Sequence, residues 1–194
     1  MSKFILGSSS LRRRLLFSEI IENFSVMSPN IDETVFELEL PYDYVKRMSY
    51  EKLLSIINIE ARYPILCADT IVTLNNEILG KPANFDDAVC TLAKLSTYTH
   101  EVITSISVFN PNRKDISSSC ETTKVKFKEL STEDITQYLS RINWQDKAGS
   151  YAIQEDNSII EHIDGSLSNV IGLPIELTFR LLIEDGLLLE YGLL

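Results

Sequence analysis

Runs of apolar and β-branched residues predict β-strands at several points along the chain. Lys3–Leu6 is a short run of this kind, and the longer run Ile65–Leu74 has the composition of a buried strand. Glu101–Phe109 and Glu121–Phe127 are also rich in β-forming residues, and we expect them to pair across the polar loop Asn110–Ser119. Shorter strands are predicted at 77–79, after the turn signal Asn75-Asn76, and at 151–154 and 159–163.

Apolar residues spaced three and four apart predict helices between these strands. The first helix follows the turn Gly7–Ser10, because Leu11, Leu15, Leu16 and Ile20 have helical spacing. The other predicted helices are one over 42–57, one with Ala88, Val89, Leu92 and Leu95 on a single face, one after the capping box Ser131–Asp134, and a last one from Pro174 to Gly186.

Strands and helices mix here without strict alternation, which favours an α/β fold with a mixed sheet. The chain has 194 residues. We expect residues 1–194 to form a single domain, made of two closely joined lobes. A chain of this length can bury roughly 70% of its unfolded surface without staples.

The small number of cysteines and histidines narrows the kinds of metal site and catalytic site that the chain can form. Cys67, Cys90 and Cys120 lie far apart with no Cys-x-x-Cys, which indicates reduced thiols in a cytosol. His100 and His162 are the only histidines and leave little for a histidine-based metal site or triad. No stretch reaches the roughly 18 consecutive apolar residues of a membrane span. We therefore expect a cytoplasmic protein with no membrane partner.

The charge balance excludes a general nucleic-acid binder. The formal net charge is −10, whereas proteins that bind extended DNA or RNA are normally basic. Basic residues cluster at Arg12–Arg14 and again at Lys46, Arg47 and Lys52. An acidic chain that keeps basic residues in a few places suits a small anionic ligand bound locally.

The N-terminal strand, turn and helix form a candidate anion site. Free backbone N–H groups and the helix dipole at such a helix start favour a negative ligand. Arg12, Arg13 and Arg14 in the first turn interact unfavourably with that dipole, at a cost of a few tenths of a kcal/mol each. A bound phosphate would make the contribution of these arginines favourable. The alternative is a solvated basic face. A Walker loop is excluded because Gly-x-x-x-x-Gly-Lys is absent.

Asp69 interrupts the apolar run Cys67–Leu74 with one carboxylate, and Leu79-Gly80-Lys81-Pro82 follows closely. A buried acid is unfavourable unless it is paired, holds a metal or takes part in chemistry. The alternative is a strand-end aspartate that caps a turn.

Three further polar segments are weak signals alone. Asp32-Glu33-Thr34 lies between two predicted helices, and a capping role suits Asp32 best. Lys52 shares a helix with apolar residues, where a snorkelling surface lysine is the alternative. Asp146–Gln154 is a polar loop that enters a strand, and a plain glycine turn would explain it equally.

Taken in order, these segments resemble the Maf family of nucleoside triphosphate pyrophosphatases. The resemblance runs from about Phe4 to Leu182 and is carried by several motifs together. These are Leu6–Arg13, Asp32-Glu33-Thr34, Tyr44-Val45-x-Arg47-x-x-x-x-Lys52, Ala68-Asp69-Thr70, Leu79-Gly80-Lys81-Pro82, Leu95-Ser96 with Thr99–Val102, Asp146–Gln154, and Gly165-Ser166 with Asn169-Val170-x-Gly172-Leu173-Pro174.

The resemblance implies a two-lobed fold, similar to the inosine triphosphate pyrophosphatases, with a long mixed central sheet flanked by helices and an active-site cleft between the lobes. It also implies cleavage of a nucleoside triphosphate to the monophosphate and pyrophosphate with a divalent cation, Mg²⁺ or Mn²⁺. Ala68-Asp69-Thr70 with Lys147-Ala-Gly-x-Tyr-x-Ile-Gln154 resembles the branch that prefers dTTP and UTP, not the 7-methyl-GTP branch.

The site residues that the resemblance implies fall into three groups. Arg12, Arg13, Lys52, Lys81 and Lys147 would hold phosphates, with Lys52 and Lys81 counted among the catalytic residues, and Ser8 would bind substrate in the same turn. Glu33 and Asp69 would bind the metal or activate water, with Asp69 the favoured base. Thr70 and Gln154 match positions linked to base choice.

One departure from the family pattern is Leu11, where the family usually has proline before the paired arginines. Proline would pre-set the first helical φ, so we expect a slightly looser turn.

From the charges we hypothesise in-line attack by a metal-activated water on the α-phosphorus. Two alternatives stay open, namely a binding role in cell-division arrest and a house-cleaning activity on modified nucleotides. A homodimer also stays open.

Overall fold

The computed structural model describes residues 4–191. Its strands are β1 (Phe4–Gly7), β2 (Phe24–Val26), β3 (Ile65–Leu74), β4 (Glu77–Leu79), β5 (Thr99–Asn110), β6 (Asp115–Phe127) and β7 (Ile160–Asp164). Its helices are α1 (Leu11–Ser18), α2 (Pro41–Ile57), α3 (Phe85–Leu95), α4 (Thr132–Arg141), α5 (Leu167–Ile171), α6 (Ile175–Glu184) and α7 (Leu188–Tyr191), with a 3₁₀ turn η1 (Ala148–Ser150). Lys3, the expected start of the first strand, lies outside the described residues.

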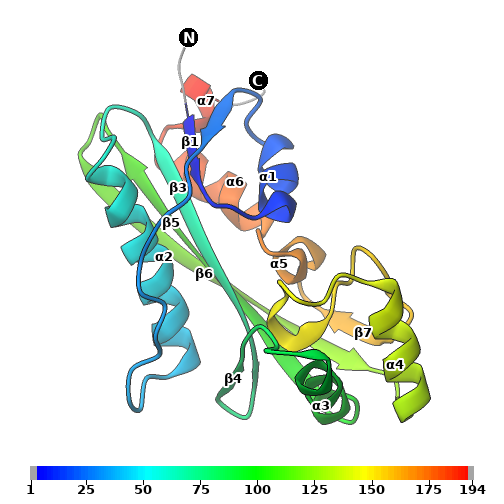
Figure 1. Cartoon of the computed structure of the whole chain (residues 1–194). Coiled ribbons are helices and arrows are strands. Elements are labelled where there is room, and N and C mark those ends of the chain that lie inside the picture. The colour runs from blue at the N-terminus through cyan, green and yellow to red at the C-terminus, as the bar shows by residue number, and fades with distance from the viewer. Residues whose placement is uncertain (1–3, 192–194) are drawn as a thin grey trace.

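One seven-stranded sheet organises the chain, with the order β2-β1-β3-β5-β6-β7 and β4 paired to β3. β1 is parallel to β2 and β3, and the remaining pairs are antiparallel. The long strands β3, β5 and β6 form the spine of the molecule (Figure 1). Asn75 and Asn76 both adopt positive φ between β3 and β4, as the tight turn of such a hairpin requires. The expectation of a mixed α/β sheet flanked by helices is confirmed.

Helices cover the two faces of the sheet in different ways. α2 packs along one face, where Ile65 and Cys67 of β3 meet Leu53 and Ile56 of α2. On the opposite face, α1, α6 and α7 enclose one apolar cluster and α3 and α4 enclose another (Figure 1). Side chains alternate between faces along a strand, so β3 serves both layers and is buried almost throughout.

The structure corrects several expectations about the elements. The loop after Phe109 is shorter than predicted, because β6 already begins at Asp115 and its serine hydroxyls bond across the sheet, as Ser118 does to Ser107 at 2.8 Å. Residues 151–154 are not a strand, because 151–152 are irregular and a turn covers 153–155. Of the residues predicted to form the apolar face of the first helix, Leu16 and Ile20 are buried, whereas Leu11 and Leu15 are exposed. Phe17 takes their place in the core. β2, α5 and α7 were not predicted.

Between residues 4 and 191, none of the helices is both long and apolar enough to cross a membrane.

Candidate active site

A gap in the hydrogen-bonded edge of β3 creates the candidate site. β1 pairs with β3 only over Ile65–Cys67, and β4 pairs with it only from Val72 onward. Between these two ladders, the described partner of Ala68–Ile71 is β5 alone. The chain leaves the sheet at both ends of the gap, through Ser8–Ser10 after β1 and through Gly80 after β4. A cleft of about 570 Å³ opens there.

All ten predicted site residues line this cleft. They come from segments that are far apart in the chain and include the turn after β1, the loop before α2, α2 itself, β3, the loop after β4 and the loop around η1. The residues are Ser8, Arg12, Arg13, Glu33, Lys52, Asp69, Thr70, Lys81, Lys147 and Gln154. What these segments share is proximity to the gap in the sheet.

Lys52 of α2 joins the two predicted carboxylates. Its Nζ lies 2.5 Å from Asp69 Oδ1 and 2.7 Å from Glu33 Oε1. Lys52 and Asp69 are both buried, whereas about half of the Glu33 side chain is exposed. Partial burial acts to raise the pKa of Glu33, but the hydrogen bond and charge of Lys52, helped by Lys81 and Arg13, outweigh it and hold that pKa below its usual range. Lys52 is therefore no surface lysine, and its charge keeps Glu33 ionised.

The turn after β1 fixes Arg13 firmly. Ser10 caps α1 by accepting a hydrogen bond from the backbone N–H of Arg13. The guanidinium then donates from Nε to the Gly172 carbonyl at 2.9 Å, from Nη1 to Ser8 Oγ at 3.1 Å and from Nη2 to Thr70 Oγ1 at 3.1 Å. Burial lowers the pKa of Arg13, yet a guanidinium stays charged at any ordinary pH. Arg13 has five donors, so this bracing leaves two to meet a ligand.

Thr70 is the centre of a hydroxyl chain that the sequence did not reveal. Its Oγ1 lies 2.9 Å from Thr104 Oγ1, and Thr104 in turn approaches the Asn169 carbonyl at 3.4 Å. Thr104 is fully buried in β5, opposite Thr70 in the register of the sheet. The contacts of Thr70 thus serve to hold Arg13. The only sequence signal for Thr104 was a polar residue at an alternating position of a strongly apolar strand.

A second group of basic side chains in the cleft meets at Asp146. Arg12 Nη1 approaches Asp146 Oδ2 at 3.5 Å, and Lys147 Nζ contacts Asp146 at 2.5 Å, the Asn143 carbonyl at 2.5 Å and Glu155 at 3.2 Å. The Lys147 side chain is almost completely buried and uses its three donors on these partners. Asp146, quoted only as the start of a motif, is therefore a residue that positions both cations.

Gly149 allows this loop to approach the sheet. It has φ +69°, and a Cβ there would lie 2.9 Å from Val72 Cγ2. Only glycine fits both the left-handed backbone and the close approach. Its N–H donates to the Gly80 carbonyl at 3.2 Å, so the loop is tied to the segment that carries Lys81.

Lys81 and Gln154 are exposed residues on the cleft wall. Gln154 Nε2 has a long 3.5 Å contact with Glu155, so its amide remains accessible to a ligand.

Leu11 is two-thirds exposed at the start of α1, and the helix begins there without proline. Asp32 accepts from the N–H and hydroxyl of Thr34 and so caps a local turn rather than a helix.

The carboxylates that could hold a metal are Glu33 and Asp69. Both contact the same Lys52 ammonium, so they face a common point. Within residues 4–191, no group of three or more His, Cys, Asp or Glu side chains could hold an ion by itself. Mg²⁺ commonly uses one or two carboxylates together with waters and substrate phosphates, so this donor set fits a divalent cation shared with a phosphate ligand.

The fold and cleft together define an α/β protein whose site combines braced arginines, lysines and paired carboxylates, a set suited to a phosphate-bearing ligand. Comparison with known proteins agrees with this class. The family described as Maf-like protein matches residues 3–184, and the chain belongs to it.

Two relatives show how far the similarity extends. The dTTP/UTP pyrophosphatase of Pyrococcus furiosus is 39% identical over 186 residues, which cover 94% of this chain and 95% of the relative. The dTTP/UTP pyrophosphatase of Thermosipho melanesiensis is 43% identical over 172 residues, which cover 88% and 91%. Among solved structures, the Ham1 protein of Staphylococcus aureus has a TM-score of 0.54 at 12% identity and covers 95% of this chain and 100% of that one. This last likeness concerns the fold alone and agrees with the expected fold.

Proposed function

We propose that this chain is a nucleoside triphosphate pyrophosphatase that hydrolyses dTTP and UTP to the monophosphate and pyrophosphate. The names of the relatives support the substrate class. The observation that carries the proposal is the convergence of all ten predicted residues on one cleft at the gap in β3. No single motif would have placed paired carboxylates and braced cations within one site.

The residues of the cleft divide the reaction between them. The two unpaired donors of Arg13 and the exposed ammonium of Lys81 bind phosphate oxygens and stabilise charge on the departing pyrophosphate. A water oxygen attacks the α-phosphorus, and the bond from that phosphorus to the bridging oxygen breaks with its electrons on pyrophosphate. Asp69 accepts the proton of the water. Lys52 keeps Asp69 and Glu33 oriented toward the reaction.

Glu33 and Asp69 would hold the divalent cation, Mg²⁺ or Mn²⁺. When bound, the cation lowers the pKa of a coordinated water and neutralises phosphate charge. An aspartate carboxylate is a weak base toward ordinary water, so the cation would supply the activation that Asp69 alone cannot.

The test is a nucleotide panel assayed for both pyrophosphate and orthophosphate with Mg²⁺ or Mn²⁺. We expect dTTP and UTP to give pyrophosphate and the monophosphate. Release of orthophosphate and a diphosphate would contradict attack at the α-phosphorus. Faster turnover of modified nucleotides such as 7-methyl-GTP would favour a house-cleaning substrate instead.

A binding role in division arrest makes a different prediction. If the cellular effect of overproducing the protein persists in Asp69→Asn while turnover is lost, binding and not catalysis is responsible.

The free thiols of Cys67, Cys90 and Cys120 support a reducing, cytoplasmic compartment.

A further inference from the structure

Glu33 is a predicted catalytic residue in a segment without helix or strand. Residues 27–40 connect β2 to α2 as an irregular loop with one turn at 37–38. After Glu33, the large apolar side chains of Val35, Phe36, Leu38 and Leu40 are all substantially exposed. Hydrophobic burial therefore does not fix this part of the loop. We call residues 32–39 the strap.

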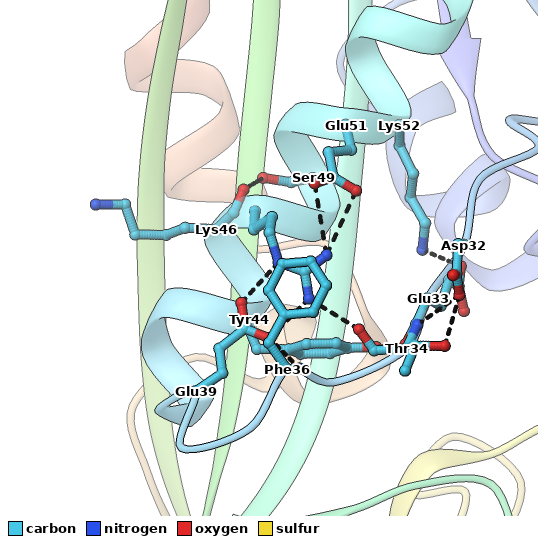
Figure 2. A network of polar contacts seen from close by, with 11 residues as sticks. Asp32, Glu33, Thr34, Phe36, Glu39, Tyr44, Lys46, Ser49, Glu51 and Lys52 are labelled. Carbon is cyan, nitrogen blue, oxygen red and sulfur yellow. Dashed lines mark hydrogen bonds and ion pairs between the residues drawn. The ribbon is translucent and has the colours of Figure 1, made fainter.

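Polar contacts with α2 hold the strap instead. Arg47 grips Glu39 with two parallel hydrogen bonds, Nε to Oε1 at 2.6 Å and Nη2 to Oε2 at 2.7 Å. Nη2 also donates to the Thr34 carbonyl at 2.9 Å, and the guanidinium lies 3.8 Å from the centroid of the Phe36 ring. Figure 2 shows Thr34, Phe36 and Glu39 gathered beside α2. We call the Arg47–Glu39 pair the clasp.

The clasp differs from an ordinary surface ion pair. The side chains of Arg47 and Glu39 are 18% and 9% exposed, and the pairing is bidentate with a stacked ring. Such geometry is specific to arginine, because lysine offers neither the fork nor the planar face. The hydrogen bond from Arg47 also holds the pKa of Glu39 below its usual range, so the clasp stays charged at neutral pH.

Two of the hydrogen bonds by which α2 holds the strap go to the backbone carbonyls of Glu33 and of the residue after it. Tyr44 OH donates to the Glu33 carbonyl at 2.9 Å, and Arg47 holds the carbonyl of the next residue. α2 also supplies Lys52, which contacts Glu33 Oε1 (Figure 2). One rigid helix therefore sets both the position of the Glu33 backbone and the cation that its carboxylate meets.

We propose that Arg47 and Glu39 are positioning residues that hold Glu33 in the cleft through the strap, without touching the substrate. This inference rests on the proposed function of Glu33. It also explains why Arg47 stands five residues before Lys52 in the same motif. The spacing puts Arg47 and Lys52 on one helix, with their Cα atoms about 7.5 Å apart along its axis.

The test compares Arg47→Lys and Glu39→Gln with Glu51→Gln as the matched control. Glu51 is the other ion-pair partner of Arg47 among the described residues, at 3.4 Å, and it belongs to α2 and not to the strap. We expect the first two variants to lower kcat roughly 10- to 100-fold, the scale for misplacing a catalytic group, with little change in the KM for nucleotide. The concentration of divalent cation that gives half of the maximal rate should rise. Glu51→Gln should resemble the wild type.

Two further measurements separate positioning from a general loss of structure. In a Glu33→Gln background, Arg47→Lys should lower kcat no further, because the clasp acts through Glu33. Hydrogen exchange of the wild-type chain and the variants, without nucleotide or metal, should show faster exchange confined to the strap in Arg47→Lys and Glu39→Gln.

The proposal would be overturned if Arg47→Lys lowered kcat by the same factor in the Glu33→Gln background as in the wild type. Unchanged hydrogen exchange of the strap in the variants would also overturn it. A wild-type chain that releases no pyrophosphate would instead contradict the proposed function, and the exchange experiment would then test the clasp by itself.

Discussion

Lys52 Nζ and Asp69 Oδ1 lie 2.5 Å apart in the buried wall of the cleft, joining a helix to a sheet strand. Neither charge would be tolerated alone at this depth, since a buried unpaired ion costs several kcal/mol. The pair explains how an aspartate can interrupt the apolar strand β3. Loss of the Lys52 charge would leave Asp69 without its ion-pair partner, whereas loss of the Asp69 charge would leave Lys52 paired with Glu33.

Asp69→Asn is the first test of the chemistry, because it keeps the shape and removes the negative charge. We expect the rate of pyrophosphate release to fall by at least about 100-fold, the usual scale for loss of a general base. The control is Asp164→Asn, which changes an exposed carboxylate at the end of β7. Near-normal turnover in a folded Asp69→Asn protein would mean that Glu33 or the metal alone activates the water.

Gln154→Ala tests base recognition. The amide carries both a donor and an acceptor and is accessible in the cleft, whereas thymine and uracil present an N3–H between two carbonyls. We expect the preference for dTTP and UTP over CTP to shrink, because a site that pairs with a base edge rejects the wrong base strongly. The measurement is kcat/KM for the three nucleotides, with the exposed Gln137→Ala as control. Unchanged ratios would assign Gln154 to the structure of the turn.

Thr104→Val tests the hydroxyl chain behind Arg13. The variant keeps the shape of the side chain but removes the hydroxyl that meets Thr70 Oγ1 at 2.9 Å. Because Thr70 in turn accepts from Arg13, we expect a several-fold rise in the KM for nucleotide and a loss of about 1 kcal/mol in the free energy of unfolding. Thr104→Ser keeps the hydroxyl and should bind like the wild type. Equal KM values for the valine and serine variants would show that the chain does not position Arg13.

His100 predicts a pH dependence of stability. The imidazole is 1% exposed, its Nε2 lies 3.0 Å from Tyr151 OH, and burial lowers its pKa to about 4 from 6.5. Between these two values the unfolded chain binds more protons than the folded one, so the stability that neutral His100 provides is complete above pH 6.5 and is lost as the pH falls toward 4.

The measurement is urea unfolding at pH 7 and pH 5 for the wild type and His100→Gln, which does not titrate and can still bond Tyr151. The wild type should lose about 2 kcal/mol more than the variant between these pH values, from 1.36 kcal/mol for each pKa unit. Equal losses would mean that His100 titrates normally in the folded chain.

Local structure could be predicted well where one physical signal dominated. The β-branched run of β3 gave a strand with the expected bounds Ile65–Leu74, and the capping box at Ser131 gave the start of α4. Prediction failed where tertiary contacts overrode composition. The serines at the start of β6 look like loop residues, and they form a strand because Ser107 and the neighbouring strand provide hydrogen-bond partners.

The candidate site shows the same division. Its residue types, their order and their chemistry follow from the sequence, since the motifs name the carboxylates, arginines and lysines directly. The hydrogen bonds and ion pairs that those residues form with one another do not follow from the sequence. Lys147 was expected to hold phosphate, and the structure shows its ammonium bound to Asp146, Glu155 and a carbonyl. Partners that lie far away in the chain cannot be identified from spacing alone.

The β-branched run Ile65–Leu74 is enough to place Asp69 and Thr70 on one strand. Their side chains therefore point to opposite faces of a sheet, because side chains alternate along an extended backbone. That both side chains reach the same cleft follows from how distant parts of the chain pack together. The ladders of β1 and β4 stop on either side of them, so the edge of β3 is open at this point and both of its faces are accessible. Asp69 there meets Lys52 from α2, and Thr70 meets Arg13 from α1. Such a gap depends on where two distant strands end, which no local pattern encodes.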